Sequence, residues 1–340
     1  MADLLAVPDD RKSAIERIAN EFRTGRSVAI STHINSDGDG CGSEVALARL
    51  LAQLGIEARI ANPTPWPAMF EFLLGDDVRN FSDDAEKTIR KADLIVVLDI
   101  SDLRRLGPLG PVVRESGATK IVIDHHIPSD VAITDLALCD TAACATGELI
   151  YDVAAVLELE LTAPVAEALY VALLTDTGGF RFSNTSARCH AIAGALLAAG
   201  VDPEAMYRRI YASVPVGRLH LLRDALATLE VDPEYGISWI SVEAGAAETH
   251  GLKSEDLDGI AEHPRSVSGT KMAIFFRDLG HGKVKVSFRS AGAVDVNAFA
   301  KEFGGGGHAK ASGALIAGSL EEVRHDVVAA ARVFLNAGKI

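Results

Sequence analysis

The sequence predicts an α/β protein in which a parallel sheet with helices on both faces is followed by a helical connector and a smaller α/β domain. Three observations support this prediction. The chain has 340 residues, more than one domain usually holds. Between residues 28 and 140, short β-branched runs alternate with helix-like segments, as in a parallel sheet. Strand-like runs return after residue 232, so we expect domains at 1–190 and 232–340, joined by a connector at 191–231.

The sheet of the first domain is expected to begin with a strand at 28–32, a short β-branched run. A helix is predicted over 42–54, because apolar residues recur there on one face and Gly55 suits a C-terminal cap. The other strand candidates are 57–61, 94–98, 120–123 and 131–136. The continuous apolar runs at 94–98 and 120–123 indicate strands that are buried on both faces.

The middle of the chain is predicted to be helical from 147 to about 229, with an apolar helix over 165–174 and a glycine-containing loop at 176–185. Pro203 and Pro215 divide the later part, which favours helices near 187–200, 203–213 and 216–229. The second domain is expected to contain strands at 236–242, 271–277 and 283–289, a helix at 296–303 and a final helix at 320–336.

The charge balance of the chain limits the kind of partner that it binds. Acidic residues number 47 and basic residues 33, which argues against a grip on long duplex nucleic acid through many phosphate contacts. A small anionic substrate needs only a few local cations or metal ions. No apolar run reaches 18 residues, and the N-terminal segment lacks the basic flank and long apolar stretch of a signal peptide. We therefore expect no membrane partner and a cytoplasmic location.

Polar clusters follow the carboxyl ends of three predicted strands. The clusters are His33, Asp37 and Asp39 after 28–32, Asp99 after 94–98, and Asp124, His125 and His126 after 120–123. Ligands of open parallel sheets bind outside these strand ends, so segments that are distant in sequence are expected to converge there. Asp176 ends the apolar helix at 165–174 and is a fourth candidate for the same place.

These residue types together predict a metal site. Carboxylates suit hard divalent cations and imidazole shifts the preference toward transition metals, so the set favours Mn²⁺, with Mg²⁺, Fe²⁺ or Co²⁺ as substitutes. The ligands are too numerous for one ion, and two ions about 3.5–4 Å apart activate water for attack on phosphorus. Each residue alone has an ordinary structural explanation, because Asp often caps turns and most His side chains are satisfied polar groups. The recurrence at strand ends favours a joint site that hydrolyses a phosphate ester.

A glycine run in the second domain is a candidate anion site. The predicted substrate-binding residues are Arg289, Gly304, Gly305, Gly306, Gly307 and His308. Glycine lets backbone N–H groups approach an anion closely, although a flexible turn between a helix and a strand also explains such a run. Arg289 leaves a predicted strand on the side that it shares with Ser287, and its guanidinium can hold a phosphate bidentately.

The segment just after Asp176 has two interpretations of equal weight. Phe180 and Phe182 are placed to stack on a base, and Arg181 between them is placed to meet a phosphate. Packing of the aromatic rings into the core explains the same residues. The histidines outside the strand-end clusters and the glycine run show no ligand spacing and are interpreted as structural or surface residues.

These motifs resemble those of the DHH/DHHA1 phosphoesterase family, and specifically its two-domain NrnA-like members, over nearly the whole chain. In the first domain they are His33-Ile-Asn-Ser-Asp37-Gly-Asp39-Gly-Cys-Gly42-Ser43, Leu98-Asp99-Ile-Ser-Asp102, Asp124-His125-His126 and Leu174-Thr-Asp176-Thr-Gly178. In the second they are Val286-Ser-Phe-Arg289-Ser290 and Phe303-Gly304-Gly-Gly-Gly307-His308. Family members commonly carry Pro in place of Ser36 and Ala in place of Gly40, so a more flexible first loop is expected here.

The resemblance implies a metal-binding DHH domain that cuts and a DHHA1 domain that grips the nucleotide. It implies one ion at His33, Asp37 and Asp99, and a second ion at Asp39, Asp99, His125 and Asp176, so that Asp99 bridges them. The implied nucleophile is a water or hydroxide between the ions. Asp124 would orient a ligand, and His126 would face the substrate or assist protonation of the leaving oxygen.

The implied activity is hydrolysis of short oligoribonucleotides and removal of the 3′-phosphate of 3′-phosphoadenosine 5′-phosphate (pAp). The shared motifs leave cyclic di-AMP, or its linear product, open as an alternative substrate. Inorganic pyrophosphate is a third candidate substrate, but the glycine run fits a nucleotide better than pyrophosphate. A non-catalytic RNA-binding module is disfavoured because every expected ligand is present, and a long single-strand exonuclease because of the chain length and acidic balance. The oligomeric state, including a homodimer, stays open.

Overall fold

The computed structural model describes residues 4–22, 26–127, 135–253, 255–257, 259–307 and 309–338. The chain forms two compact units, Met1–Ala212 and Ser213–Ile340. The predicted connector at 191–231 is therefore divided, because two of its helices pack on the first core and one packs on the second. None of the helices in these described ranges combines the length and the apolar character that a membrane span needs.

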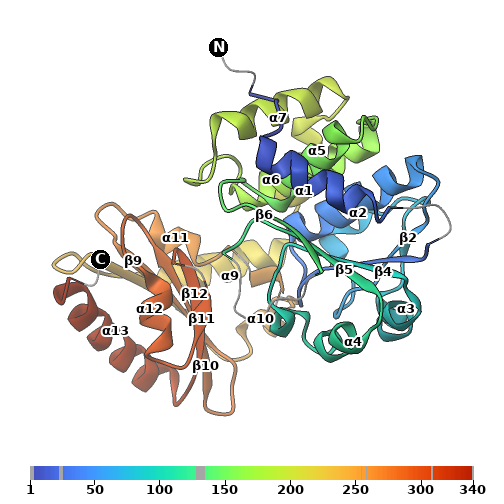
Figure 1. The fold of residues 1–340 in the computed structure, drawn as a ribbon. Coiled ribbons are helices and arrows are strands. Elements are labelled where there is room, and N and C mark those ends of the chain that lie inside the picture. Colours follow the sequence, from blue (N-terminus) through green and yellow to red (C-terminus); the bar gives the residue numbers. More distant parts are fainter. Residues whose placement is uncertain are drawn as a thin grey trace. The chain divides into compact units, whose positions relative to one another are not determined.

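The first unit alternates strands and helices (Figure 1). In chain order its elements are α1 (Asp9–Ala19), β1 (Val28–Ser31), α2 (Gly38–Gln53), β2 (Ala58–Ile60), β3 (Arg79–Asn80), α3 (Ala85–Lys91), β4 (Leu94–Leu98), α4 (Leu109–Glu115), β5 (Thr119–Asp124), β6 (Leu136–Cys139), α5 (Thr146–Val156), α6 (Ala163–Asp176), α7 (Ala187–Ala198) and α8 (Pro203–Tyr211). Short 3-10 turns lie at η1 (Ala68–Leu73), η2 (Ser82–Asp84) and η3 (Leu103–Leu106). Strands β1, β2, β4 and β5 begin and end within one residue of the predicted positions.

The described strands of the first unit form one parallel sheet in the order β3-β2-β1-β4-β5-β6. The chain runs outward from β1 to β3 and then returns to β4 on the other side of β1. This reversal between β1 and β4 is the switch point at which parallel sheets bind ligands. Of the strand candidate at 131–136, residues 131–134 lie outside the described residues, and the strand found there is β6.

Helices cover both faces of this sheet, as predicted. In β4, Leu94, Val96 and Leu98 pack toward α1, α2, α5, α6 and α7, while Ile95 and Val97 pack toward α3 and α4. Figure 1 shows α3 and α4 on one side of the strands and α1 and α5 on the other. Because both faces are buried, the strand residues are apolar without alternation, which is why the strands could be located from the sequence.

The second unit has its own mixed sheet. Its elements are α9 (Val216–Ala227), β7 (Glu230–Asp232), β8 (Ile237–Val242), α10 (Ala246–Thr249), η4 (Glu255–Leu257), α11 (Glu262–Arg265), β9 (Met272–Asp278), β10 (Lys283–Ser290), α12 (Val296–Lys301), β11 (Gly306–Gly307), β12 (Ala311–Ala317) and α13 (Leu320–Asn336). The described strands lie in the order β11-β12-β10-β9-β8-β7, and only the β8–β9 pair is parallel. The sequence does not predict β12, because its many Ala and Gly residues have low strand propensity.

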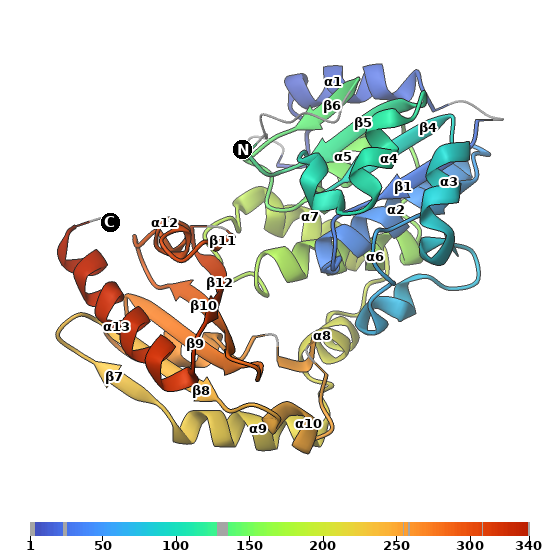
Figure 2. The same cartoon turned by 90° about the horizontal axis from the view of Figure 1, so that it is seen from below.

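Different helices pack on the two faces of the second sheet. Val284, Val286 and Phe288 of β10 pack with α12 and α13, where Phe299 and Phe334 lie. Helix α9 and the segments around α10 and α11 cover part of the opposite face. Figure 2 shows α13 and α9 on opposite sides of the strands. The alternate residues of β10 therefore point away from the α12–α13 core, toward the less covered face.

Candidate metal centre

The predicted site residues of the first unit meet at the switch point of its sheet. The segments after β1, β4 and β5 carry most of them, and these strands are neighbours in the sheet. Asp176 joins them from the last position of α6, a helix that packs against α2. The side chains form donor groups whose atoms lie within 4.8 Å of one another. The groups found among the described residues are His33, Asp37 and Asp99; Asp39, His125 and Asp176; and Asp99, His125 and His126.

Asp99 lies between the donor groups. Its Oδ2 is 3.4 Å from Nε2 of His33, and its Oδ1 is 3.6 Å from Nε2 of His125. The two oxygens of one carboxylate therefore face different groups. Asp99 follows β4 with a φ of 62°, a left-handed conformation that costs free energy for most residues and that Asp tolerates better than most. Such strain is often kept where a side chain must be aimed at a site.

Helix α2 positions two of the carboxylates. Oδ1 of Asp37 accepts hydrogen bonds from the backbone N–H groups of Asp39 and Gly40, both at 3.1 Å, and so caps the helix. The predicted helix start at residue 42 is therefore wrong by four residues, because this cap begins the helix at Gly38. A Cβ at Gly40 would lie 2.9 Å from Oγ1 of Thr32, so the glycine allows this first turn to pack closely on β1.

Both imidazoles of the proposed ligand set are oriented by backbone carbonyl groups. Nδ1 of His33 lies 2.9 Å from the carbonyl oxygen of Ile34, and Nδ1 of His125 lies 3.3 Å from that of Ala143. An Nδ1–H that donates to a carbonyl leaves Nε2 to bind either a proton or a cation. Both Nε2 atoms are buried and have no hydrogen-bond partner in the part of the chain that the structure describes. Buried nitrogen atoms surrounded by carboxylates fit a divalent cation.

Asp124 contacts His126, which is not one of the six proposed ligands. Its Oδ1 accepts a hydrogen bond from the His126 backbone N–H at 3.0 Å and lies 2.8 Å from Nδ1 of the ring. Burial alone would raise the pKa of Asp124, but the hydrogen bonds from His126 lower it. Asp124 therefore remains ionised and fixes the ring of His126.

Three residues that the sequence analysis missed, Thr146, Gly147 and Asn184, donate hydrogen bonds to the carboxylates. The backbone N–H of Thr146 donates to Oδ2 of Asp39 at 2.7 Å, and its hydroxyl donates to Oδ1 of Asp99 at 3.0 Å. The Gly147 N–H donates to Oδ1 of Asp39 at 2.9 Å, and Nδ2 of Asn184 donates to Oδ2 of Asp176 at 3.0 Å. A sequence signal was available, because Thr-Gly-Glu opens an apolar helix and so marks a helix N-terminus with unpaired N–H groups.

Crowding of buried charges shifts several pKa values. Burial alone would lower the pKa of His33, but Asp37 and Asp99 outweigh it and raise the pKa to about 10. In the same way, Asp39, Asp176 and Asp99 raise the pKa of His125 to about 9. Burial and then the charge of Asp39 raise the pKa of Asp176 to about 7. In metal-free protein the cluster thus holds protons at positions where a bound cation would supply positive charge.

Metal affinity is expected to rise with pH because these protons compete with the cation. At pH 8 both His33 and His125 are protonated in the metal-free protein, since their pKa values are about 10 and about 9, and Asp176 is mostly ionised. Burial also raises the pKa of Asp99 well above its ordinary value, so this carboxyl adds to the proton uptake. Binding of metal should therefore release at least two protons, and affinity should increase up to about pH 10. Titration calorimetry of Mn²⁺ in two buffers with different ionisation enthalpies counts these protons. A pH-independent affinity with no proton release would contradict the prediction.

In the segment after Asp176, one aromatic residue packs into the core and the other is accessible to a ligand. Phe180 is half-buried, packs against the core and stacks on His190 with ring centroids 5.4 Å apart. Core packing therefore explains Phe180. Phe182 is 41% exposed and lies over Gly178, where an added Cβ would come within 2.6 Å of its ring. Arg181 is also exposed, so Phe182 and Arg181 are the members of this segment that are accessible to a ligand.

The predicted substrate-binding residues of the second unit lie at two places on its sheet. Arg289 belongs to β10, and its Nε donates to Oε1 of Glu262 at 2.9 Å. The glycine run lies two strands away, where Gly304 ends the turn after α12 and β11 pairs with β12. A Cβ at residue 305 would lie 2.2 Å from the carbonyl oxygen of Gly313, so close backbone packing explains that glycine. His308 lies outside the described residues.

Comparison with known protein families identifies two domains in this chain. The DHH family N-terminal domain matches residues 27–173, which include every proposed metal ligand except Asp176. The DHHA1 domain matches residues 238–337, which include Arg289 and the glycine run. Each match lies within one of the two compact units.

Similar proteins match the chain over most of its length. The bifunctional oligoribonuclease and PAP phosphatase NrnA of Thermus thermophilus is 32% identical over 90% of this chain and 89% of that protein. The protein of the same name from Bacillus subtilis is 28% identical over 85% of this chain and 89% of its own length. The crystal structure of an exopolyphosphatase-related protein from Bacteroides fragilis, 27% identical, superposes with a TM-score of 0.90 over 97% of this chain and 98% of that one. The chain therefore belongs to the DHH/DHHA1 phosphoesterase family, among its NrnA-like two-domain members.

Proposed function

We propose that this protein is a two-metal-ion phosphoesterase that hydrolyses short oligoribonucleotides and removes the 3′-phosphate of pAp. The observation that carries the proposal is the Asp99 carboxylate, whose oxygens lie 3.4 Å from Nε2 of His33 and 3.6 Å from Nε2 of His125. A carboxylate that faces two donor groups is placed to be a ligand of two cations. Pairs of cations with a shared ligand are used by enzymes to cleave phosphate esters. Similarity to two bacterial proteins named oligoribonuclease and PAP phosphatase supports the substrate class.

The proposed ligands divide into two sets that share Asp99. The first set is His33, Asp37 and Asp99, and the second is Asp39, Asp99, His125 and Asp176. When bound, two divalent cations lower the pKa of water and neutralise the charge that develops on phosphorus. His126 is the proposed group for protonation of the leaving oxygen, because Asp124 holds its ring in a fixed orientation 2.8 Å away.

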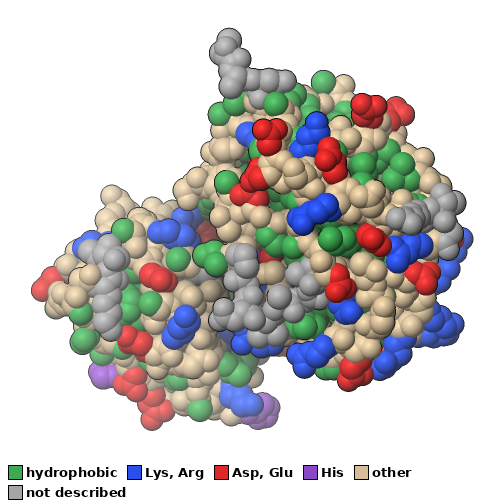
Figure 3. All heavy atoms as spheres, in the orientation of Figure 1, with side chains coloured by type: hydrophobic (Ala, Val, Ile, Leu, Met, Phe, Trp, Pro, Cys, Tyr) green, Lys and Arg blue, Asp and Glu red, His purple; other side chains and the backbone are tan. Residues whose placement is uncertain are grey.

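We propose Mn²⁺ as the cation, because four carboxylates and two imidazoles form a mixed oxygen and nitrogen set, with Mg²⁺, Co²⁺ or Fe²⁺ as substitutes. The four cysteines are free thiols, which agrees with a reducing compartment and supports a cytoplasmic location. On the face of the first unit seen in Figure 3, acidic side chains lie among the basic ones. The excess of 47 acidic over 33 basic residues in the whole chain supports short rather than long nucleic acid as the partner.

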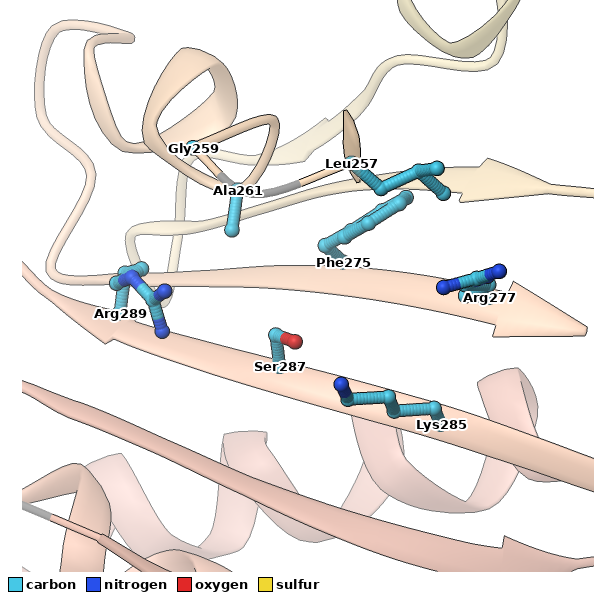
Figure 4. A pocket seen from close by; sticks show the side chains of 8 residues that line it. All are labelled: Leu257, Gly259, Ala261, Phe275, Arg277, Lys285, Ser287 and Arg289. Carbon is cyan, nitrogen blue, oxygen red and sulfur yellow. The ribbon is translucent and has the colours of Figure 1, made fainter. Parts of the chain in front are cut away.

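We propose that the second unit binds the nucleotide through Arg289, the glycines at 304–307 and His308. The side chain of Arg289 is 26% exposed and lines a hollow together with Arg277 and Lys285 (Figure 4). A phosphate would compete with Glu262 for this guanidinium, because both are anions that prefer its planar donor edge.

A substrate panel tests the proposed function. The Mn²⁺-loaded protein is expected to convert pApA and pAp to AMP, to cleave cyclic di-AMP and pyrophosphate more slowly, and to lose these activities in EDTA. Rates measured side by side by chromatography decide among the alternatives. Faster turnover of cyclic di-AMP than of pApA would indicate a signalling phosphodiesterase, and turnover of pyrophosphate alone a pyrophosphatase. If pApA and pAp were untouched and no Mn²⁺ bound, the first unit would be a non-catalytic domain.

A further inference from the structure

The supporting segment, residues 140–147, leads from the end of β6 into the first turn of α5 and contacts ligands of the proposed second ion. The backbone N–H groups of Thr146 and Gly147 donate to the two oxygens of Asp39, at 2.7 and 2.9 Å. The Thr146 hydroxyl donates to Asp99 at 3.0 Å. Two of the four ligands of this ion are therefore held by the first turn of α5, where unpaired N–H groups favour anions.

The other two ligands of this ion are reached from carbonyl groups of the same segment. The carbonyl oxygen of Ala143 lies 3.3 Å from Nδ1 of His125. The carbonyl oxygen of Cys144 accepts a hydrogen bond at 2.8 Å from Nδ2 of Asn184, which also donates to Oδ2 of Asp176 at 3.0 Å. The supporting segment thus contacts every ligand of the second set, either directly or through Asn184.

The first ligand set depends on this segment only through the shared Asp99. The ring of His33 is oriented by the carbonyl group of Ile34, and Asp37 is held by the backbone of α2, which it caps. No hydrogen bond among the described residues joins His33 or Asp37 to the supporting segment. A change in the shape of this segment would therefore move ligands of the second ion more than ligands of the first.

Arg11 of α1 contacts the acidic residues at both ends of the supporting segment. Its Nε donates to Oδ2 of Asp140 at 2.6 Å, and its Nη1 donates to Oε1 of Glu148 at 2.7 Å. Nε of Arg188 lies 3.3 Å from the same oxygen of Glu148. The other oxygen, Oε2, accepts a hydrogen bond from the backbone N–H of Cys144 at 3.1 Å. One guanidinium therefore closes the loop, and one carboxylate joins that guanidinium to the backbone that contacts the ligands.

The ion pair between Arg11 and Glu148 is buried. The side chain of Arg11 is 4% exposed and that of Glu148 is 1% exposed, and α1 packs against both β6 and α5 (Figure 1). A buried ion pair adds little stability compared with apolar residues of similar volume, because both charges lose their hydration. Its best supported use is to select one arrangement of the surrounding chain. The arrangement that this pair selects is that of the supporting segment.

We propose that Arg11 and Glu148 are positioning residues for the second ion, and that their ion pair determines the affinity of that ion. The inference rests on the proposed function, since it assigns a structural cause to the affinity of one of the two cations. In the described ranges neither residue forms a hydrogen bond or ion pair with a proposed ligand, so the effect is transmitted by the supporting segment. Glu148→Gln is expected to weaken the second Mn²⁺ about tenfold and to leave the first nearly unchanged.

Asp152→Asn is the matched control for Glu148→Gln. Asp152 is buried and pairs with Arg11 and Arg188, as Glu148 does, but in the described part of the chain it forms no hydrogen bond with the supporting segment. Gln and Asn each retain one oxygen, so each variant loses one of the two contacts that its carboxylate makes. Both variants should therefore lower the melting temperature of the metal-free protein, whereas only Glu148→Gln should weaken the binding of Mn²⁺.

Titration calorimetry of Mn²⁺ in two backgrounds identifies the affected ion. Asp176→Asn removes a ligand of the second set alone. Asp37→Asn removes a ligand of the first set alone, and its side-chain oxygen still caps α2. Adding Glu148→Gln to Asp37→Asn should weaken the remaining Mn²⁺ about tenfold, while adding it to Asp176→Asn should change the affinity of the remaining ion by less than about twofold.

Wild-type protein that binds two Mn²⁺ ions would uphold the two-metal proposal and leave the inference to be decided by the variants. Equal weakening in both backgrounds, or equal effects of Glu148→Gln and Asp152→Asn on Mn²⁺, would overturn the inference alone. If wild type bound no Mn²⁺, the proposed function would fail and the inference with it.

Arg11→Lys is a second variant for the case that Glu148→Gln does not fold. Lysine keeps the positive charge but lacks the planar fork with which the guanidinium contacts Asp140 and Glu148 together. The same selective weakening of the second ion is expected in the Asp37→Asn background, and equal affinities with and without Arg11→Lys would contradict the inference.

Discussion

Replacing Asp99 by Asn is expected to lower kcat for pApA by at least about 10³-fold, because several kcal/mol of charge stabilisation depend on this carboxylate. The variant keeps the shape of the side chain but removes the negative charge that faces both donor groups at 3.4 and 3.6 Å. We therefore expect the number of bound Mn²⁺ ions to fall from two to one. Calorimetric titration of Mn²⁺ and steady-state rates on pApA measure the two effects.

The metal-free stability of the Asp99→Asn protein separates a functional loss from misfolding. Burial and the neighbouring charge of Asp39 raise the pKa of Asp99 well above its ordinary value, so an ionised Asp99 destabilises the metal-free protein. Above neutral pH the variant should be at least as stable as wild type without metal, and it should gain less stability from Mn²⁺. Asp83→Asn, at an exposed carboxylate in η2, is the matched control and should change neither property. Full activity with two bound ions in Asp99→Asn would refute the shared-ligand proposal.

Removing the Thr146 hydroxyl is expected to lower Mn²⁺ affinity or kcat about 10–100-fold, although Thr146 belongs to neither proposed ligand set. The side chain is fully buried, and its hydroxyl donates to Oδ1 of Asp99 at 3.0 Å. Thr146→Val has nearly the same shape and retains the backbone N–H that donates to Oδ2 of Asp39 at 2.7 Å. Its effect therefore isolates the loss of one hydrogen bond to the shared carboxylate. Mn²⁺ titration and kcat on pApA measure it.

Thr146→Ser is the matched control, because it retains the hydroxyl and loses only a methyl group. Affinity and rate should recover to within a few-fold of wild type in Thr146→Ser, while the salt dependence of substrate binding should be the same in both variants. If Val and Ser at this position behaved alike, the methyl group and not the hydrogen bond would matter. Such a result would make Thr146 a packing residue.

Local sequence signals located most of the sheet that carries the site. The run at 94–98 matches β4, because a strand buried on both faces is apolar without interruption. The start of α2 was misplaced because Asp37 has two roles: its Oδ1 caps the helix, and its Oδ2 lies 3.7 Å from Nε2 of His33. Strand β11 escaped prediction because two glycines form it by pairing with β12, a contact distant from any local pattern.

The sequence alone determined which chemical groups are present and that they follow parallel strands, because the periodicity of buried strands and the types of polar residues are local properties. It thereby identified the proposed ligands His33 and Asp99 and the candidate phosphate group Arg289. Only the tertiary structure decided that each oxygen of Asp99 faces a different imidazole, that Thr146 supports this carboxylate, and that Arg11 contacts both Asp140 and Glu148. These are contacts between strands and helices far apart in the chain, and their geometry depends on sheet order and register, which no local pattern encodes.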